Sequence, residues 1–237
     1  MSSWVKKGLK TGIVTTSYPK EDEKTLGITP GFPKSTDCDE VDNEALISLC
    51  PMDALYYKNH KVMIESKDCV HCYRCLRNVE KPISWDDGFK WSVLQKKQTG
   101  FSKSFSRSIH ILVVDAGDCG ACLNEVKLLN NPFYNMHRLG FFVTPSPRKA
   151  DVLLVVGPVS EHLKTALLKA YNAMPTPKKV MAVGACSLSG GVFKESFVVN
   201  QGVEKILPVD IQIPGCPPPP LAILEGLLQL VKEKDNG

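Results

Sequence analysis

The sequence predicts an α/β protein, in which a doubly wound parallel sheet follows a smaller α+β domain. Two observations support this. From residue 109 onward, buried apolar runs alternate with segments of helical spacing, which is typical of a parallel sheet covered on both faces. Before residue 95, only short strand-like and helix-like segments surround closely spaced cysteines. Together they indicate two structural units of different kinds.

Composition and the positions of turn-forming residues divide the chain into four segments. Residues 1–36 lack a sustained period and are expected to form an extended arm, and residues 37–94 a cysteine-bearing domain. Residues 95–108 are Ser-rich, carry no acid and are typical of a linker. Residues 109–237 form the larger domain.

The predicted elements follow in chain order. In the smaller domain they are a helix over 41–49, strands over 54–57 and 62–64, and a helix over 72–79. In the larger domain the strands are 109–114, 152–156, 179–183 and 209–213, and the helices are 122–129, 161–174 and 221–231. The last helix begins just after a proline run, and proline is tolerated in a first turn.

Charge and cysteine content exclude several classes of protein. The net charge of +4 is too small to indicate a nucleic-acid partner, and no apolar stretch is long enough to span a bilayer. No apolar run follows the basic N-terminus, so a secretory signal is not expected and a cytoplasmic location is. The nine cysteines are odd in number and partly arranged as Cys-x-x-Cys, which favours metal binding over a disulfide framework.

The first group of cysteines is Cys69-x-x-Cys72-x-x-Cys75, with Cys50 followed by a proline. In bacterial ferredoxins with two clusters, the cysteine of the Cys-Pro pair ligates the cluster held by the other motif. That rule joins Cys50 to the triplet as the fourth ligand of one [4Fe–4S] cluster. A structural zinc site on the same four thiols is the alternative.

This segment resembles a bacterial-type ferredoxin that has lost one cluster. The missing motif would need cysteines at four positions, which hold Glu40, Asn43, Leu46 and Val79 instead. Cys38 has no partner in this scheme and is expected to be an inert thiol. His71 lies inside the motif and is expected at the surface.

The second group comprises Cys119, Cys122, Cys186 and Cys216. Each follows a predicted strand, and ligands of open parallel sheets bind beyond the carboxyl ends of the strands. Three loops at that edge can therefore bring four thiolates together. Glycines next to these cysteines allow close backbone approach and offer N–H groups to sulfide.

Residues 109–232 resemble the small iron–sulfur subunit of nickel–iron hydrogenases and the homologous complex I subunit that carries the cluster nearest the quinone. The matching stretches are Asp115-x-Gly-x-Cys-x-x-Cys-x-x-Glu125, 146–157, Gly184-Ala-Cys-x-x-x-Gly-Gly191 and 209–218. The resemblance implies a flavodoxin-like fold and a second [4Fe–4S] cluster on the second group of cysteines.

The spacing of the first cysteine pair favours one branch of this family. Complex I subunits place these cysteines in tandem, whereas hydrogenase subunits separate them by two residues, as here. This favours a small subunit of a membrane-linked, energy-converting hydrogenase. Gly120-Ala121 replaces the usual Asn-Gly of hydrogenases, and Asp118 replaces a common Ser. A complex-I-like partner that reduces a quinone or sulfur acceptor without nickel therefore stays open.

The resemblance implies an electron-transfer subunit without an active site of its own. No nucleophile–base pair, Walker loop or Gly-x-Gly-x-x-Gly fingerprint is present. The implied partners are a large catalytic subunit, other iron–sulfur or ferredoxin carriers, and membrane subunits that hold the chain peripherally at the cytoplasmic face. A zinc-stabilised assembly scaffold is the alternative from another class.

Glu125 lies three residues after Cys122, in the first turn of a predicted helix. The resemblance implies a role in proton transfer or partner contact. An ordinary acid favoured by the helix dipole explains the position equally well.

Overall fold

The structure is a computed structural model, and it describes residues 2–25, 28–37, 40–77, 83–95, 108–194 and 196–232. Cys38, Val79 and most of the predicted linker lie outside the described residues. Among the described residues, no helix is both long and apolar enough to cross a membrane.

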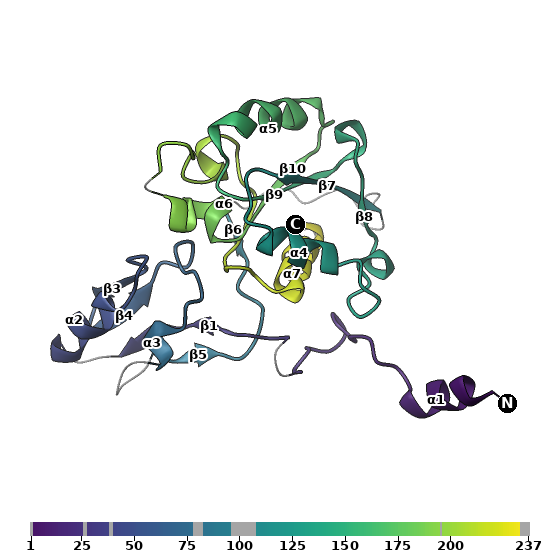
Figure 1. Cartoon of the computed structure of the whole chain (residues 1–237), viewed down its shortest axis with the longest axis horizontal. Helices are drawn as coiled ribbons and strands as arrows, with labels where there is room; N and C mark the ends of the chain where they lie inside the picture. Colours follow the sequence, from purple (N-terminus) through teal and green to yellow (C-terminus); the bar gives the residue numbers. More distant parts are fainter. Residues whose placement is uncertain are drawn as a thin grey trace.

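A six-stranded sheet forms the centre of the larger part of the molecule (Figure 1). Its strands are β6 (Val93–Leu94), β7 (Ile109–Asp115), β8 (Phe141–Val143), β9 (Val152–Val156), β10 (Lys179–Val183) and β11 (Ile211–Ile213). Their order is β6-β11-β10-β9-β7-β8, and every pair is parallel except β6 with β11. The predicted α/β class with a mostly parallel sheet is therefore confirmed.

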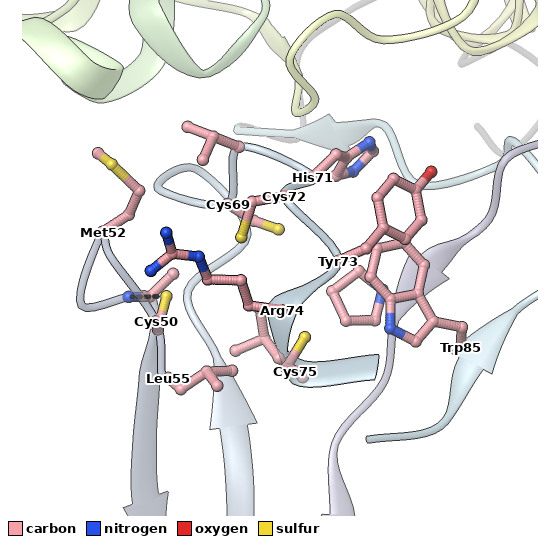
Figure 2. A pocket seen from close by; sticks show the side chains of 14 residues that line it. Cys50, Met52, Leu55, Cys69, His71, Cys72, Tyr73, Arg74, Cys75 and Trp85 are labelled. Atoms are coloured by element: carbon pink, nitrogen blue, oxygen red, sulfur yellow. Dashed lines mark hydrogen bonds between the residues drawn. The ribbon is translucent and has the colours of Figure 1, made fainter. Parts of the chain in front are cut away.

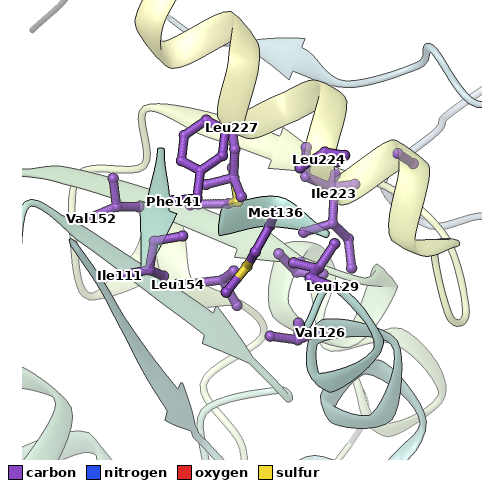
Figure 3. Close-up of a cluster of buried hydrophobic side chains, with 14 of the residues drawn as sticks. Ile111, Val126, Leu129, Met136, Phe141, Val152, Leu154, Ile223, Leu224 and Leu227 are labelled. Carbon is purple, nitrogen blue, oxygen red and sulfur yellow. The ribbon is translucent and has the colours of Figure 1, made fainter. Parts of the chain in front are cut away.

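Helices cover both faces of this sheet (Figure 1). They are α4 (Ala121–Leu128), α5 (Glu161–Ala173), α6 (Ala185–Ser189) and α7 (Pro220–Lys232). One apolar core joins α4 and α7 to one face of the strands, including Ile111, Leu154 and Leu227 (Figure 3). A second core joins α5 and α6 to the opposite face through Leu167 and Leu188.

Two strands occupy the predicted residues, β9 over 152–156 and β10 over 179–183. Both are buried along their whole length, and strands buried on both faces give continuous apolar runs. The strand predicted over 209–213 is shorter. Asp210 precedes it, and its carboxylate accepts the N–H of Val180 at 2.7 Å.

The smaller part of the molecule contains short elements, as predicted. They are β1 (Phe32–Pro33), β2 (Thr36–Asp37), α2 (Glu40–Ser48), β3 (Leu55–Lys58), β4 (Lys61–Ile64), α3 (Arg74–Arg77) and β5 (Trp85–Asp86). The strands β2, β4 and β3 form an antiparallel sheet, and β1 pairs with β5. A small core of Leu46, Leu55, Val62 and Ile83 supports them, and Cys50 and Cys75 pack against it.

The N-terminal arm departs from the expectation of an extended segment, since it begins with helix α1 (Ser3–Thr11). None of the residues of α1 is buried, and its three large apolar residues, Trp4, Val5 and Leu9, are too few to establish a sustained helical period in the sequence. Further along the arm, Tyr18 is buried and its ring packs edge-on against Phe89, 4.9 Å between centroids.

Candidate metal centres

The four cysteines of the first group line one cavity in the smaller part of the molecule. Cys50 lies between α2 and β3, and Cys69, Cys72 and Cys75 follow β4. Figure 2 shows the four side chains around this space, with Arg74 running between them. A cation is suited to such a site, because four thiolates there carry like charge.

The backbone of the triplet turns sharply around this cavity. His71 and Tyr73 adopt left-handed conformations, with φ of 51° and 60°. Non-glycine residues rarely do so, and such strain is concentrated at functional sites. Two N–H groups serve the sulfurs: the amide of Ala54 donates to Cys50 Sγ at 3.3 Å, and the amide of His71 donates to Cys69.

An aromatic wall closes one side of the cavity. Tyr73 stacks on Trp85 at 4.5 Å between centroids, and His71 meets Trp85 edge-on. The expectation that His71 lies at the surface is wrong, because its side chain is half-buried and burial lowers its pKa to about 4. The ring is therefore neutral at pH 7.

Two buried ring nitrogens in this wall, His71 Nε2 and Trp85 Nε1, have no hydrogen-bond partner of ordinary geometry within the described residues. Trp85 nevertheless lies close enough to Cys75 to lower the pKa of that thiol, against the opposing effect of burial. Buried polar atoms rarely stay unsatisfied. An acceptor such as the sulfide of a cluster fits this environment.

The second group of cysteines gathers at the carboxyl edge of the larger sheet, as predicted. Cys119 and Cys122 follow β7, Cys186 lies in α6 just after β10, and Cys216 follows β11. Burial raises the pKa of Cys122, Cys186 and Cys216, and the neighbouring cysteines raise it further. The four thiols are therefore near enough to interact electrostatically.

Glycines bring these loops into direct contact. A Cβ on Gly184 would lie 2.5 Å from Cys122 Sγ, and one on Gly191 would lie 2.9 Å from Cys186 Sγ. The loops after β10 and β11 are also hydrogen-bonded, since the amide of Ala185 donates to the carbonyl of Gly215 at 2.8 Å. In the same region, the indole N–H of Trp91 donates a hydrogen bond to the carbonyl of Pro214 at 2.8 Å. At Gly184 and Gly191 the backbone therefore lies so close to the cysteine sulfurs that it leaves no room for a side chain.

Asp118 shapes the loop that carries the first cysteine pair. Its carboxylate accepts the N–H groups of Gly120 and Leu123, each at 3.0 Å, and so satisfies a free donor in the first turn of α4. Its charge also raises the pKa of Cys122 and Cys186. Four thiolates beside an acid are stable only with a bound cation, and metal binding releases their protons.

The two groups of cysteines face each other through hydrogen-bonded loops. Ser189 Oγ donates to the carbonyl of Lys67 at 3.2 Å, and Lys194 Nζ donates to that of Met52 at 3.4 Å. Ser189 lies three residues after Cys186, and Lys67 lies two before Cys69. The sequence offered no signal for these contacts, which join residues more than a hundred positions apart.

Each group also has one exposed member, Cys72 in the first and Cys119 in the second. Within the described residues, no three His, Cys, Asp or Glu side chains are placed as ligands of a single metal ion. Zinc and a [4Fe–4S] cluster both bind through cysteine thiolates, so the set of ligands in each group suits either metal centre.

Residues 119–230 match the family described as "NADH ubiquinone oxidoreductase, 20 Kd subunit". The chain is also 40% identical over 135 residues to the "Probable membrane-bound hydrogenase subunit mbhJ" of Pyrococcus furiosus, covering 57% of this chain and 81% of that protein. The chain belongs to this family. All four cysteines of the second group lie in the matched region, and the first group lies before it.

Other members of the 20 kDa subunit family are similarly close. The chain is 44% identical over 129 residues to an NADH-quinone oxidoreductase subunit of Bacteroides thetaiotaomicron, covering 54% of this chain and 64% of that protein. Among solved structures, it resembles a chain of the membrane-bound sulfane sulfur reductase, an archaeal respiratory membrane complex. That match has a TM-score of 0.51 and 30% identity, and it covers 56% of this chain and 74% of the other.

Glu125 lies on α4, within the matched region, and is partly buried. Burial raises the pKa of its carboxyl above the ordinary value, and its charge raises the pKa of Tyr134. The two side chains are therefore close enough to interact electrostatically. Glu125 is the fifth residue of α4 and therefore lies beyond the first turn, where the helix dipole would favour an acid. A role in proton transfer or in contact with a partner stays a prediction.

Proposed function

We propose that this chain is an electron-transfer subunit of a membrane-associated oxidoreductase complex and holds two [4Fe–4S] clusters. The convergence of eight cysteines into two groups, joined by hydrogen-bonded loops, carries the proposal. Cys50, Cys69, Cys72 and Cys75 would hold the first cluster. Cys119, Cys122, Cys186 and Cys216 would hold the second.

The proposed domains follow those predicted from the sequence, except that β1 and β2 of the predicted arm join the smaller domain and β6 joins the larger sheet. Strands β7 to β11, numbered one to five in chain order, lie in the order 2-1-3-4-5, which supports a flavodoxin-like larger domain. Cys119 and Cys122 follow the strand at which this order reverses, where such sheets bind ligands. The buried Leu46 replaces a ligand of the missing motif in the smaller, ferredoxin-like domain.

The positions of the exposed cysteines suggest the route of the electrons. Bound iron–sulfur clusters supply one-electron chemistry. Cys72 would face one electron carrier and Cys119 the large catalytic subunit, because each is the exposed member of its group. Ser189 and Lys194 hold the two loops together between these surfaces and so keep the distance between the groups constant.

An energy-converting nickel–iron hydrogenase complex is the partner that we favour, because Cys119 and Cys122 are separated by two residues. A nickel-free complex that reduces a sulfur compound or quinone is the second candidate. Similarity to a chain of the sulfane sulfur reductase complex supports it. In either complex the chain would lie at the cytoplasmic face of the membrane, bound to other subunits.

Metal analysis of the anaerobically purified complex tests the proposal. We expect about eight irons per chain and broad visible absorbance, since each group takes four irons. Cys75→Ser and Cys216→Ser should each remove about half of the iron, from different clusters distinguishable by electron paramagnetic resonance. Zinc in place of iron would contradict the proposal. Nickel with hydrogen turnover would identify the favoured partner, and active complex without nickel would identify the second.

A further inference from the structure

Helix α1 carries large apolar side chains that no other described part of the chain covers. Trp4 and Leu9 are 74% and 73% exposed, and Ile13, just beyond the helix, is 90% exposed. Figure 1 shows α1 standing away from the rest of the molecule. Exposed apolar residues gathered in this way mark a surface that binds something.

The residues of α1 divide into two faces. At 100° per residue, Trp4, Val5 and Leu9 fall on one half of the helix, and the lysines fall on the other half. The lysines are Lys6, Lys7 and Lys10. Residues 1–20 contain no acid, so positive charge there has no local compensation. A short helix with one apolar face, one basic face and a tryptophan is suited to an anionic lipid surface.

The arm is attached to the larger part of the molecule just after α1. The amide of Thr16 donates to the carbonyl of Phe133 at 3.1 Å, and the guanidinium of Arg138 donates to the carbonyls of Thr16 and Tyr18. The hydroxyl of Tyr18 donates to the buried carboxylate of Glu225 in α7. Only four residues, 12–15, separate α1 from this attachment, so binding by α1 would hold the whole chain at the surface.

We propose that α1 binds directly to the surface of an anionic phospholipid bilayer. The apolar face enters the boundary between headgroups and acyl chains, and the lysines contact the lipid phosphates. This gives the chain its own membrane contact, in addition to that through other subunits. Membrane binding does not depend on either cluster, so the two proposals can fail separately.

Sedimentation of the full chain with vesicles tests the proposal. We expect binding to phosphatidylcholine vesicles containing about 30% phosphatidylglycerol, weak binding to phosphatidylcholine alone, and loss of binding at high salt. Each lysine near an anionic surface contributes about fivefold in affinity. The triple variant K6Q/K7Q/K10Q should therefore bind about a hundredfold more weakly.

A matched variant, K58Q/K127Q/K149Q, removes three exposed lysines outside α1 and should bind about as well as the parent chain. Brominated lipid should quench the fluorescence of Trp4 in the parent chain. Trp4→Ala should weaken binding to the vesicles and remove this quenched component of the fluorescence. Equal effects of the two triple variants would overturn the proposal. The proposal would also be overturned if α1 bound purified partner subunits and the chain did not bind vesicles at all. Unchanged iron content in all variants would confirm that the clusters are not affected.

Discussion

Gly184 is the position at which a single methyl group most directly tests the second metal centre. A Cβ there would lie 2.5 Å from Cys122 Sγ, whereas non-bonded heavy atoms ordinarily stand about 3.5–4.0 Å apart. The backbone cannot easily move away, because the amide of Gly184 donates to the carbonyl of Ile213 at 2.8 Å. Gly184→Ala should therefore displace the Cys122 sulfur by about 1 Å.

The cost of this substitution has two parts. The backbone of Gly184 has φ 90° and ψ 154°, a region that other residues enter at a cost of about 1–3 kcal/mol. Overpacking against the sulfur adds about 1–3 kcal/mol. We expect the free energy of unfolding to fall by about 2–6 kcal/mol, the sum of these two costs.

Iron content and visible absorbance distinguish a displaced ligand from general destabilisation. Gly184→Ala should lose about four of eight irons and keep the spectrum of the first cluster. Gly120→Ala is the matched control, because Gly120 has φ 93° but nothing within 4 Å of an added Cβ. It should lower stability by about 1–2 kcal/mol and keep all the iron. Full iron in Gly184→Ala would refute the argument.

Three further substitutions test the rest of the structure. Tyr18→Phe removes the hydroxyl that donates to the buried Glu225 and should lower the free energy of unfolding by about 1–3 kcal/mol, measured in urea. Asp210→Ala breaks the buried ion pair with Lys179 and should cost about 3–5 kcal/mol, measured by thermal unfolding. Burial raises the pKa of Glu125 in the folded chain, so its ionised form opposes folding. Glu125→Gln should therefore raise stability above that folded-state pKa and have little effect below about pH 4, where the carboxyl is protonated in both states.

Exposed positions provide the controls for these substitutions. Tyr56→Phe changes a tyrosine that is 41% exposed and should alter stability by less than about 0.5 kcal/mol. Asp86→Ala breaks an exposed pair with Lys34 and should cost less than about 1 kcal/mol. Equal losses in the buried and exposed variants would contradict the role of burial. A pH-independent effect of Glu125→Gln would contradict the assigned pKa shift.

Sequence periodicity predicted the larger part of the fold well. Strands buried on both faces give unbroken apolar runs, and α5 and α7 lie within one residue of the predicted helices at either end. Helix α1 was missed because its three large apolar residues, Trp4, Val5 and Leu9, are too few to establish a sustained period. The short helix α3 begins at Arg74, two residues after the predicted start at Cys72, and positions 78 and 79 of that prediction lie outside the described residues.

Cysteine spacing and position after strands were sufficient to predict which thiols group together, because these patterns are local or follow from sheet topology. The sequence by itself therefore determined the family, the α/β class and the two candidate ligand groups. Only the tertiary structure decided their surroundings: the aromatic wall at Trp85, the contact between Ser189 and Lys67, and the burial of Tyr18 against Glu225. These pairs lie far apart in the chain and share no periodic pattern, so packing alone brings them together.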